Sequence, residues 1–198
     1  MSREAMEAQA ELFGGGRRWP EGFRYGTGIL PEPDERALIP LLKELPFQAF
    51  DFHGYTGKRR VVSFGWRHDF DREAVRQTQE IPQFLVDLRE RAAAFAGLDP
   101  GRFEQVLVTE YGPGAGIGWH RDKAAFGEVI GISLLSACVF RLRRKVGGRW
   151  ERVSLLAEPR SAYLLSGASR TEWEHSIPTV GALRYSVTFR SLRPGGDG

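Results

Sequence analysis

The sequence predicts a mainly β protein with flanking helices, an α+β fold whose strand-rich second half closes into a barrel or sandwich. Two changes of pattern predict this class. In the first half, apolar residues recur at helical spacing in two segments, and from about residue 103 they alternate with a period of two. The chain has 198 residues, of which 41% are hydrophobic, a size suited to one globular domain of about residues 21–193.

The first half begins with an arm and continues with two helices. Residues 1–20 are expected to be a flexible arm, because GGGRR at 14–18 favours no regular structure, and Trp19 is expected to attach it to the body. A helix is predicted from Pro33-Asp34-Glu35 to Pro46, with four leucines at helical spacing: Leu38, Leu41, Leu42 and Leu45. A second is predicted over about 82–96, with an apolar stripe of Phe84, Leu85, Leu88 and Phe95.

The rest of the chain is read as strands. One early strand is predicted in RRVVSFGW (59–66). The later strands are predicted in FEQVLVTEY (103–111), VIGISLL (129–135), ACVFRLRR (137–144), RVSLLA (152–157), SAYLLS (161–166) and RYSVTFRSL (184–192). KVGGR at 145–149 is expected to be the tip of a hairpin.

Composition excludes several classes of protein. No apolar run reaches the length of about 18 residues that a membrane helix needs, and the charged N-terminus lacks the apolar core of a secretory signal. The single cysteine, Cys138, excludes an intramolecular disulfide and a multi-thiolate zinc site, so we expect a cytoplasmic protein. A monomer is also expected. The net charge of +3 is too small to prove a nucleic-acid partner.

His120, Asp122 and His175 form the candidate metal site. In an extended segment residues i and i+2 project to the same side, so the imidazole of His120 and the carboxylate of Asp122 converge. A histidine from a neighbouring strand completes a 2-His-1-carboxylate set, the ligand set of non-haem Fe(II) sites with open positions. His175 is the better remaining candidate because it precedes the strand that carries Arg184 and Arg190.

Two further features accompany this set. Glycines crowd the approach to His120 and leave room beside a ligand: Gly112, Gly114, Gly116 and Gly118. Arg184 and Arg190 lie six residues apart and therefore share one face of a strand. Two inward arginines need an anion, and a small dicarboxylate meets that need because guanidinium groups bind carboxylates bidentately.

Several motifs together resemble the AlkB family of Fe(II)- and 2-oxoglutarate-dependent dioxygenases, in the family's order over roughly residues 47–191. They are YGPGAGIGWHRDK (111–123), FGEVIGISL (126–134), FRLRRK (140–145), GASRTEWEHSIP (167–178) and RYSVTFR (184–190). The resemblance implies a double-stranded β-helix (jelly-roll) core at about residues 103–191 and a lid at about 47–75. It also implies Fe(II), 2-oxoglutarate and O2 as cofactor and co-substrates.

The resemblance also implies roles for single residues. His120, Asp122 and His175 look like the iron ligands, and Arg184 looks like the partner of the side-chain carboxylate of 2-oxoglutarate. Arg190 looks like the arginine near the metal-side carboxylate, and Tyr111 resembles the tyrosine that hydrogen-bonds the co-substrate. Three positions depart from the family pattern, namely Thr109 and Ser186, where Asn is frequent, and Ala124, where base-repairing members carry an acid.

The implied activity is oxidative demethylation of N-alkylated nucleic-acid bases, in DNA or RNA, with release of formaldehyde, succinate and CO2. Because of Ala124, an enzyme acting on a modified tRNA or a protein stays open. A non-catalytic nucleic-acid-binding module on the same fold and a metallohydrolase that works without O2 also remain alternatives.

Substrate contacts are expected in two segments. FGWRHDF (64–70) lies where the family keeps its lid, and the candidates to stack on a flipped base are Phe70, His68 and Trp66. Residues 141–152 hold six basic residues and one acid, so the hairpin is a candidate phosphate clamp through Arg143, Arg144 and Lys145.

Overall fold

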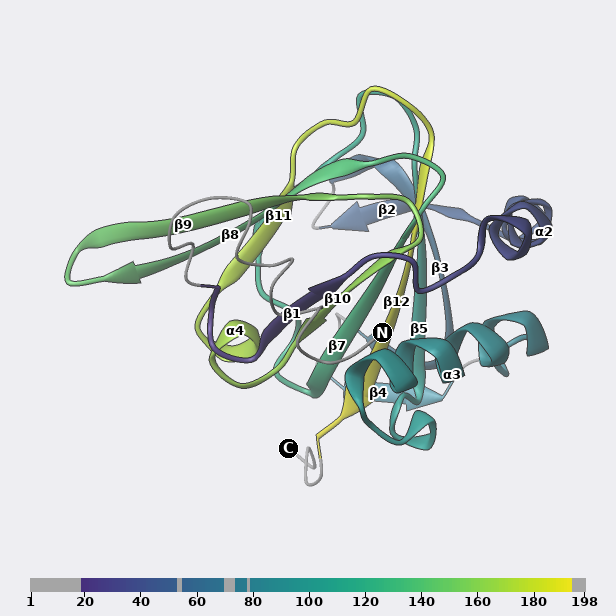
Figure 1. Ribbon diagram of the computed structural model, residues 1–198, viewed down its shortest axis with the longest axis horizontal. Helices are drawn as coiled ribbons and strands as arrows, with labels where there is room; N and C mark the ends of the chain where they lie inside the picture. The colour runs from purple at the N-terminus through teal and green to yellow at the C-terminus, as the bar shows by residue number, and fades with distance from the viewer. Residues whose placement is uncertain (1–18, 53–54, 70–73, 78, 194–198) are drawn as a thin grey trace, which may run out of the picture.

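A computed structural model of the chain describes residues 19–52, 55–69, 74–77 and 79–193 (Figure 1). Its helices are α2 (Glu32–Lys43), α3 (Gln83–Ala96), the 3-10 turn η1 (Pro100–Arg102) and α4 (Gly167–Thr171). Its strands are β1 (Phe23–Gly26), β2 (Gln48–Phe52), β3 (Tyr55–Asp69), β4 (Ala74–Gln77), β5 (Gln105–Tyr111), β6 (Ile117–His120), β7 (Phe126–Leu134), β8 (Cys138–Val146), β9 (Arg149–Ala157), β10 (Ser161–Leu165), β11 (Glu174–Ile177) and β12 (Arg184–Leu192).

The strands form two antiparallel sheets. The larger runs β1-β10-β7-β12-β5-β3-β2, with β4 paired to β3, and the smaller runs β6-β11-β8-β9. In Figure 1, α2 and α3 lie beside the larger sheet, and the β8–β9 hairpin projects from the body on the opposite side. The predicted class, mainly β with flanking helices around a jelly-roll core, is confirmed.

Two apolar clusters hold these layers together. The first lies between the two long helices and the larger sheet and includes Leu42, Leu85 and Val187, all fully buried. The second joins residues of both sheets, such as Phe140 of β8 and Tyr163 of β10. The candidate site residues lie beside this second cluster, which includes Tyr111 itself. Within the described residues, no helix has the length and apolarity needed to cross a bilayer.

The two long helices lie close to their predicted positions. α2 begins at Glu32, directly after Pro31, and ends at Lys43, three residues before Pro46. Leu38 and Leu42 are buried as predicted, but Leu41 is 46% exposed. The buried face also takes Ile39, so its centre is rotated away from Leu41.

The helix α3 follows the prediction more closely. It covers Gln83–Ala96, so Pro82 is its N-cap, and Gly97 closes it in the left-handed conformation with φ of 66°. Leu85 and Leu88 are buried as predicted, and Phe84 and Phe95 pack against the same cluster.

The predicted strands all form, and the hairpin tip lies at Gly147-Gly148 between β8 and β9. The strands β1, β2, β4, β6 and β11 were not predicted. Each has four or five residues, too few for an alternating pattern to stand out. Of the predicted arm, Trp19 lies 5.3 Å from the Phe23 ring, measured between centroids. Residues 1–18 lie outside the described part, and the 21–193 boundary stays a prediction.

Candidate functional site

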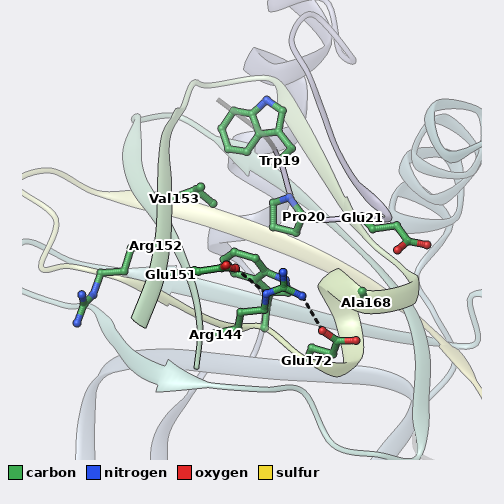
Figure 2. A pocket seen from close by; sticks show the side chains of 10 residues that line it. Trp19, Pro20, Glu21, Arg144, Glu151, Arg152, Val153, Ala168 and Glu172 are labelled. Carbon is green, nitrogen blue, oxygen red and sulfur yellow. Dashed lines mark hydrogen bonds and ion pairs between the residues drawn. The ribbon is translucent and has the colours of Figure 1, made fainter. Parts of the chain in front are cut away.

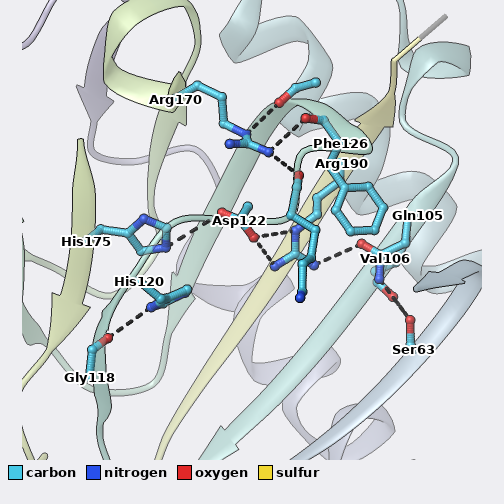
Figure 3. A network of polar contacts seen from close by, with 12 residues as sticks. Ser63, Gln105, Val106, Gly118, His120, Asp122, Phe126, Arg170, His175 and Arg190 are labelled. Carbon is cyan, nitrogen blue, oxygen red and sulfur yellow. Dashed lines mark hydrogen bonds and ion pairs between the residues drawn. The ribbon is translucent and has the colours of Figure 1, made fainter. Parts of the chain in front are cut away.

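Two of the unpredicted strands place the candidate histidines opposite each other. In the β6–β11 pair His120 is the cross-strand partner of His175, and their ring centroids are 4.2 Å apart. Figure 3 shows Asp122, just beyond β6, turned toward both rings. Its Oδ2 atom lies 3.7 Å from Nε2 of His175. The structure therefore brings together the three residues that the sequence analysis selected as metal ligands.

Their surroundings favour the protonation states in which these groups bind metals. Burial lowers the pKa of His175 to about 3, and burial also lowers the pKa of His120. Burial alone raises the pKa of Asp122, but Arg190 and the two histidines outweigh it and hold that pKa well below its ordinary value. Both imidazoles are therefore neutral and the carboxylate is ionised.

One contact also sets the tautomer of His120. Its Nδ1 atom lies 2.9 Å from the carbonyl oxygen of Gly118, so Nδ1 carries the hydrogen and donates it. The lone pair is then on Nε2. The donors match Fe(II) in kind, with two imidazole nitrogens and one carboxylate. Among the described residues, however, no group of three His, Cys, Asp or Glu is already arranged to hold an ion. The ligand role of the three residues stays a prediction.

Arg184 is the clearest sign of an absent anion. Its side chain is fully buried in β12, where Nε donates to Oγ of Ser133 at 3.1 Å and the guanidinium lies over the Tyr111 ring at 5.0 Å. Its Nη1 and Nη2 atoms are buried and have no hydrogen-bond partner. A buried guanidinium without a counter-charge is costly, and a carboxylate would satisfy both nitrogens at once.

Arg190 is different, because its charge is already paired inside the protein. Its Nη2 and Nε atoms lie 2.7 and 2.8 Å from Oδ1 of Asp122, and Nη1 donates to Gln105 at 2.9 Å. Both partners appear in Figure 3. The premise that neither arginine has a counter-charge inside the protein is therefore wrong for Arg190, whereas for Arg184 the binding of an external anion stays a prediction. Arg190 orients Asp122, and its contact with a co-substrate stays a prediction.

The other predicted co-substrate residues share one face of three neighbouring strands. Cross-strand pairs join Arg184 to Tyr111, and Ser186 to both Thr109 and Ser133. Tyr111, Thr109 and Ser186 are each 4% exposed. Since alternate residues of a strand share a face, the structure places these hydroxyl groups on the face from which Arg184 projects.

Sequence reasoning missed several residues of this region. Ser133 and Gln105 lie within predicted strands, and their period-two position was the available signal. Arg170 gave no such signal. Its guanidinium donates to the carbonyl oxygens of Lys123, Phe126 and Gly127 and so holds the segment that follows Asp122 (Figure 3).

The glycines before His120 differ in role. A Cβ at Gly116 would lie 2.8 Å from the carbonyl oxygen of Ile177, so the two backbones approach each other closely beside His175. Gly112 and Gly118 have open space at the same position. The predicted room beside a ligand therefore does not describe Gly116, which instead allows β6 to approach the segment after β11.

Of the three stacking candidates in the predicted lid, the structure describes the side chain of Trp66 alone. Trp66 is half-buried in β3, and the segment 66–69 pairs with β4. The His68 side chain and Phe70 lie outside the described residues. Ala124, at the position where base-repairing members carry an acid, is exposed. The three stacking candidates stay predictions.

The predicted phosphate clamp is divided between two faces of the hairpin. Arg144 binds Glu151 and Glu172, each at 2.8 Å, above the Trp173 ring in a pocket of about 400 Å³ (Figure 2). Two carboxylates thus balance its charge, and Arg144 does not share a face with Arg143. Phosphate binding by the hairpin stays a prediction. Lys145 is exposed near the tip.

Arg143 faces the other side, in a row of stacked side chains that we call the outer ladder, formed by Arg141, Trp119, Arg143, Trp150 and Arg152. Arg143 lies 4.4 Å from the Trp119 ring and 4.2 Å from the Trp150 ring. Arg141 lies 4.9 Å from Trp119, and Arg152 lies 6.0 Å from Trp150. The flanking Leu142 is fully buried, so alternation along β8 turns the ladder outward, away from His175.

Residues 52–190 match the family described as the 2OG-Fe(II) oxygenase superfamily. An Arabidopsis thaliana protein named "Alkylated DNA repair protein ALKBH8 homolog" is 31% identical over 69% of this chain, which spans 47% of that protein. A Mus musculus protein named "Alpha-ketoglutarate-dependent dioxygenase alkB homolog 7, mitochondrial" is 37% identical over 45% of the chain and 40% of its own length.

A third relative, from Xenopus tropicalis, is named "tRNA (carboxymethyluridine(34)-5-O)-methyltransferase alkbh8" and is 29% identical over 60% of the chain, which covers 19% of it. The solved structure of OsALKBH1 superimposes with a TM-score of 0.65 at 16% identity, over 88% of this chain and 100% of that one. This last likeness concerns the fold alone.

Proposed function

Because the chain belongs to the AlkB family of 2OG-Fe(II) oxygenases, we propose that it oxidatively demethylates N-alkylated bases in nucleic acid, with release of formaldehyde, succinate and CO2. The family membership makes the chain an oxidoreductase that uses Fe(II), 2-oxoglutarate and O2. This class speaks against the non-catalytic module and the hydrolase considered from the sequence. The nucleic-acid substrate and its lesion are the proposed part.

The residues of the site divide the work of such a reaction. Fe(II), bound with 2-oxoglutarate and O2, supplies oxidation of a C–H bond next to nitrogen, and the hydroxylated methyl group then leaves as formaldehyde. His120, Asp122 and His175 would hold the metal. Arg184 would bind the far carboxylate of 2-oxoglutarate with its two free Nη groups. Arg190 fixes the orientation of Asp122 from behind.

The outer ladder is the observation that carries the nucleic-acid part of the proposal. Guanidinium groups stacked on indole rings keep their N–H edges available to phosphate oxygens, while exposed indole faces stack on bases. Trp150 is 39% exposed. Among the residues that the structure describes, the three arginines of the ladder pair with one carboxylate, Glu174, whose Oε2 lies 2.6 Å from Arg143. The surface thus combines excess positive charge with aromatic area, as single-stranded nucleic acid requires.

A modified base in tRNA is the second candidate substrate. Two of the relatives carry ALKBH8 in their names, and the name of one of them refers to a modified uridine of tRNA. Ala124 also lacks the carboxylate that base-repairing members of the family place at this position. Both features favour a base that does not need an acidic contact there.

Formaldehyde release from defined substrates tests the proposal. N-methylated single-stranded DNA, the same sequence in RNA, and tRNA are each incubated with protein, Fe(II), 2-oxoglutarate and ascorbate. We expect formaldehyde and succinate in equal amounts from at least one of them, and neither product with Asp122→Ala. Succinate without formaldehyde from every nucleic acid would reject demethylation of nucleic acid.

The ladder is tested by binding to an unmodified single-stranded oligonucleotide. Arg143→Ala should weaken binding about tenfold and reduce the slope of log K against log[salt] by about 1. Arg36→Ala is the matched control, because Arg36 is an exposed arginine on α2 that pairs with Glu32 at 2.6 Å. If the two variants bound the oligonucleotide with equal affinity, the outer ladder would not contribute to nucleic-acid binding.

A further inference from the structure

Trp119 is the residue of the outer ladder that comes directly before a candidate metal ligand, His120. Both lie in β6, which has four residues and forms one edge of the smaller sheet, with β11 as its paired strand. The register of this pair shifts between His175 and Ile177, so the regular pairing around His120 is short. A strand with so few backbone bonds depends on its side chains for a fixed position.

The side chain of Trp119 provides such an anchor on the outer face of the sheet. The centroid of its ring lies 4.4 Å from the guanidinium of Arg143 and 4.9 Å from that of Arg141. Both arginines belong to β8, the strand on the far side of β11. The indole therefore reaches across β11 and attaches the edge strand to the strand beyond it through two cation–π contacts.

The two arginines are fixed in turn by the residues that flank His175. Arg143 is the cross-strand partner of Glu174, and its Nε lies 2.6 Å from Oε2 of that residue. Arg141 is the cross-strand partner of Ser176, and its Nε donates to Oγ at 3.1 Å. Because successive residues of a strand point to opposite faces, these contacts lie behind the imidazole of His175.

One cluster on the outer face thus lies behind both candidate histidines. On the inner face His120 and His175 are cross-strand partners whose ring centroids are 4.2 Å apart. This separation depends on how β6 lies against β11, and the stack of Trp119 on the two arginines restrains that position. A displacement of Trp119 would therefore move His120 relative to His175.

We propose that Trp119 is a positioning residue that sets the place of His120 in the metal site, and that nucleic acid bound to the outer ladder thereby alters the metal site on the opposite face. Two sites joined by one movable element influence each other reciprocally. The inference rests on the proposed function for the metal and for the ligand of the ladder. The position of β6 can be measured without either of them.

Trp119→Leu tests the positioning role, because it removes both cation–π contacts and keeps an apolar side chain. Titration calorimetry of Mn(II) should show a dissociation constant raised about 5- to 30-fold, the effect of losing two such contacts. Trp119→Tyr keeps an aromatic face and should restore the affinity to within about threefold of the parent. Unchanged affinity in Trp119→Leu, or an equal loss in both variants, would overturn the proposal.

Hydrogen exchange of the metal-free protein measures the position of the strand directly. Trp119→Leu should accelerate exchange of the backbone N–H groups of β6 about tenfold and leave exchange in β12 unchanged. Equal acceleration in both strands would indicate a general loss of stability and contradict the local role. A parent protein that bound no Mn(II) would count against the proposed function, whereas unchanged exchange in β6 would count against Trp119, so the two failures are distinguishable.

Trp19→Leu is the matched control, since Trp19 is a 41% exposed tryptophan outside the ladder whose ring lies 5.3 Å from that of Phe23. It should leave both the Mn(II) affinity and the exchange of β6 unchanged. A loss of Mn(II) affinity equal to that of Trp119→Leu would show that the effect is not specific to the ladder.

The visible absorption of the Co(II)-loaded protein tests the coupling, because these bands depend on the geometry of the metal ligands. An unmodified single-stranded oligonucleotide, added until each protein is saturated, should change the spectrum of the parent and of Trp19→Leu. It should leave the spectrum of Trp119→Leu unchanged. No change in the parent would contradict the coupling, and an equal change in Trp119→Leu would show that it does not pass through Trp119.

Discussion

Replacing Arg184 by methionine should weaken 2-oxoglutarate binding without weakening the fold. In the ligand-free protein two nitrogen atoms of this arginine are buried without partners, and only Nε is hydrogen-bonded, to Ser133. Methionine has a similar length, carries no charge and fills irregular space well. Exchanging an uncompensated buried charge for an apolar group is neutral or stabilising in other proteins.

The loss of affinity can be worked out from the two free Nη groups. Each hydrogen bond to a charged group contributes about 1.5–3 kcal/mol, so two contribute about 3–6 kcal/mol. Truncating one partner of a buried charge pair costs about 2–5 kcal/mol. The overlap of these ranges, about 3–5 kcal/mol, corresponds to a dissociation constant raised about 100- to 4,000-fold.

Two measurements on the Arg184→Met variant test whether Arg184 binds the far carboxylate of 2-oxoglutarate. Calorimetric titration of 2-oxoglutarate gives the change in affinity, and urea denaturation gives the free energy of unfolding without ligand. We expect the large loss of affinity together with an unfolding free energy no lower than that of the parent. Affinity within about threefold of the parent would show that Arg184 does not bind the carboxylate. An unfolding free energy lowered by more than about 2 kcal/mol would show that its charge is compensated inside the protein.

Three further predictions follow from the same geometry. Asp122→Ala should lower the free energy of unfolding by about 3 kcal/mol in urea denaturation, because Arg190 would then remain buried with Gln105 as its one hydrogen-bond partner among the described residues. A loss below about 1 kcal/mol would contradict the ion pair. Mn(II) added at about 100 times its dissociation constant should raise the free energy of unfolding of the parent protein by about 2.7 kcal/mol, measured by thermal unfolding. The same addition should leave the free energy of unfolding of the His175→Ala variant unchanged. An equal gain in both proteins would show that His175 is not a metal ligand. Gly116→Ala should lower both the melting temperature and the Mn(II) affinity, because its methyl group would meet the Ile177 carbonyl and separate β6 from the segment beside His175; Gly118→Ala, with open space at its Cβ, is the control.

The agreement between sequence and structure is good where the signal is local. The strand β12 is predicted over the residues it occupies, because its first seven residues, RYSVTFR, alternate between polar and apolar side chains. The helix α3 is placed within a residue by its apolar stripe and its flanking Pro82 and Gly97. The short strands β6 and β11 give no comparable signal, although they carry the two histidines.

The sequence does not predict which charged side chains form ion pairs when the partners are distant in the chain. Arg143 and Arg144 are adjacent in the sequence and were grouped as one clamp, but alternation along β8 sends them to opposite faces, each with its own carboxylates. The partner of Arg190 is likewise Asp122, 68 residues away. The sequence contains these charges but not their pairing.

By itself the sequence determined the class of fold and the residue types of a non-haem iron site, because periodicity and the spacing of His120 and Asp122 are properties of neighbouring residues. Only the tertiary structure decided which arginine lacks a counter-charge, which is Arg184, and which glycine must stay without a Cβ beside His175, which is Gly116. The reason is physical. Compensation of a buried charge and exclusion of a Cβ depend on distances between strands that are remote in sequence, and strand pairing sets those distances.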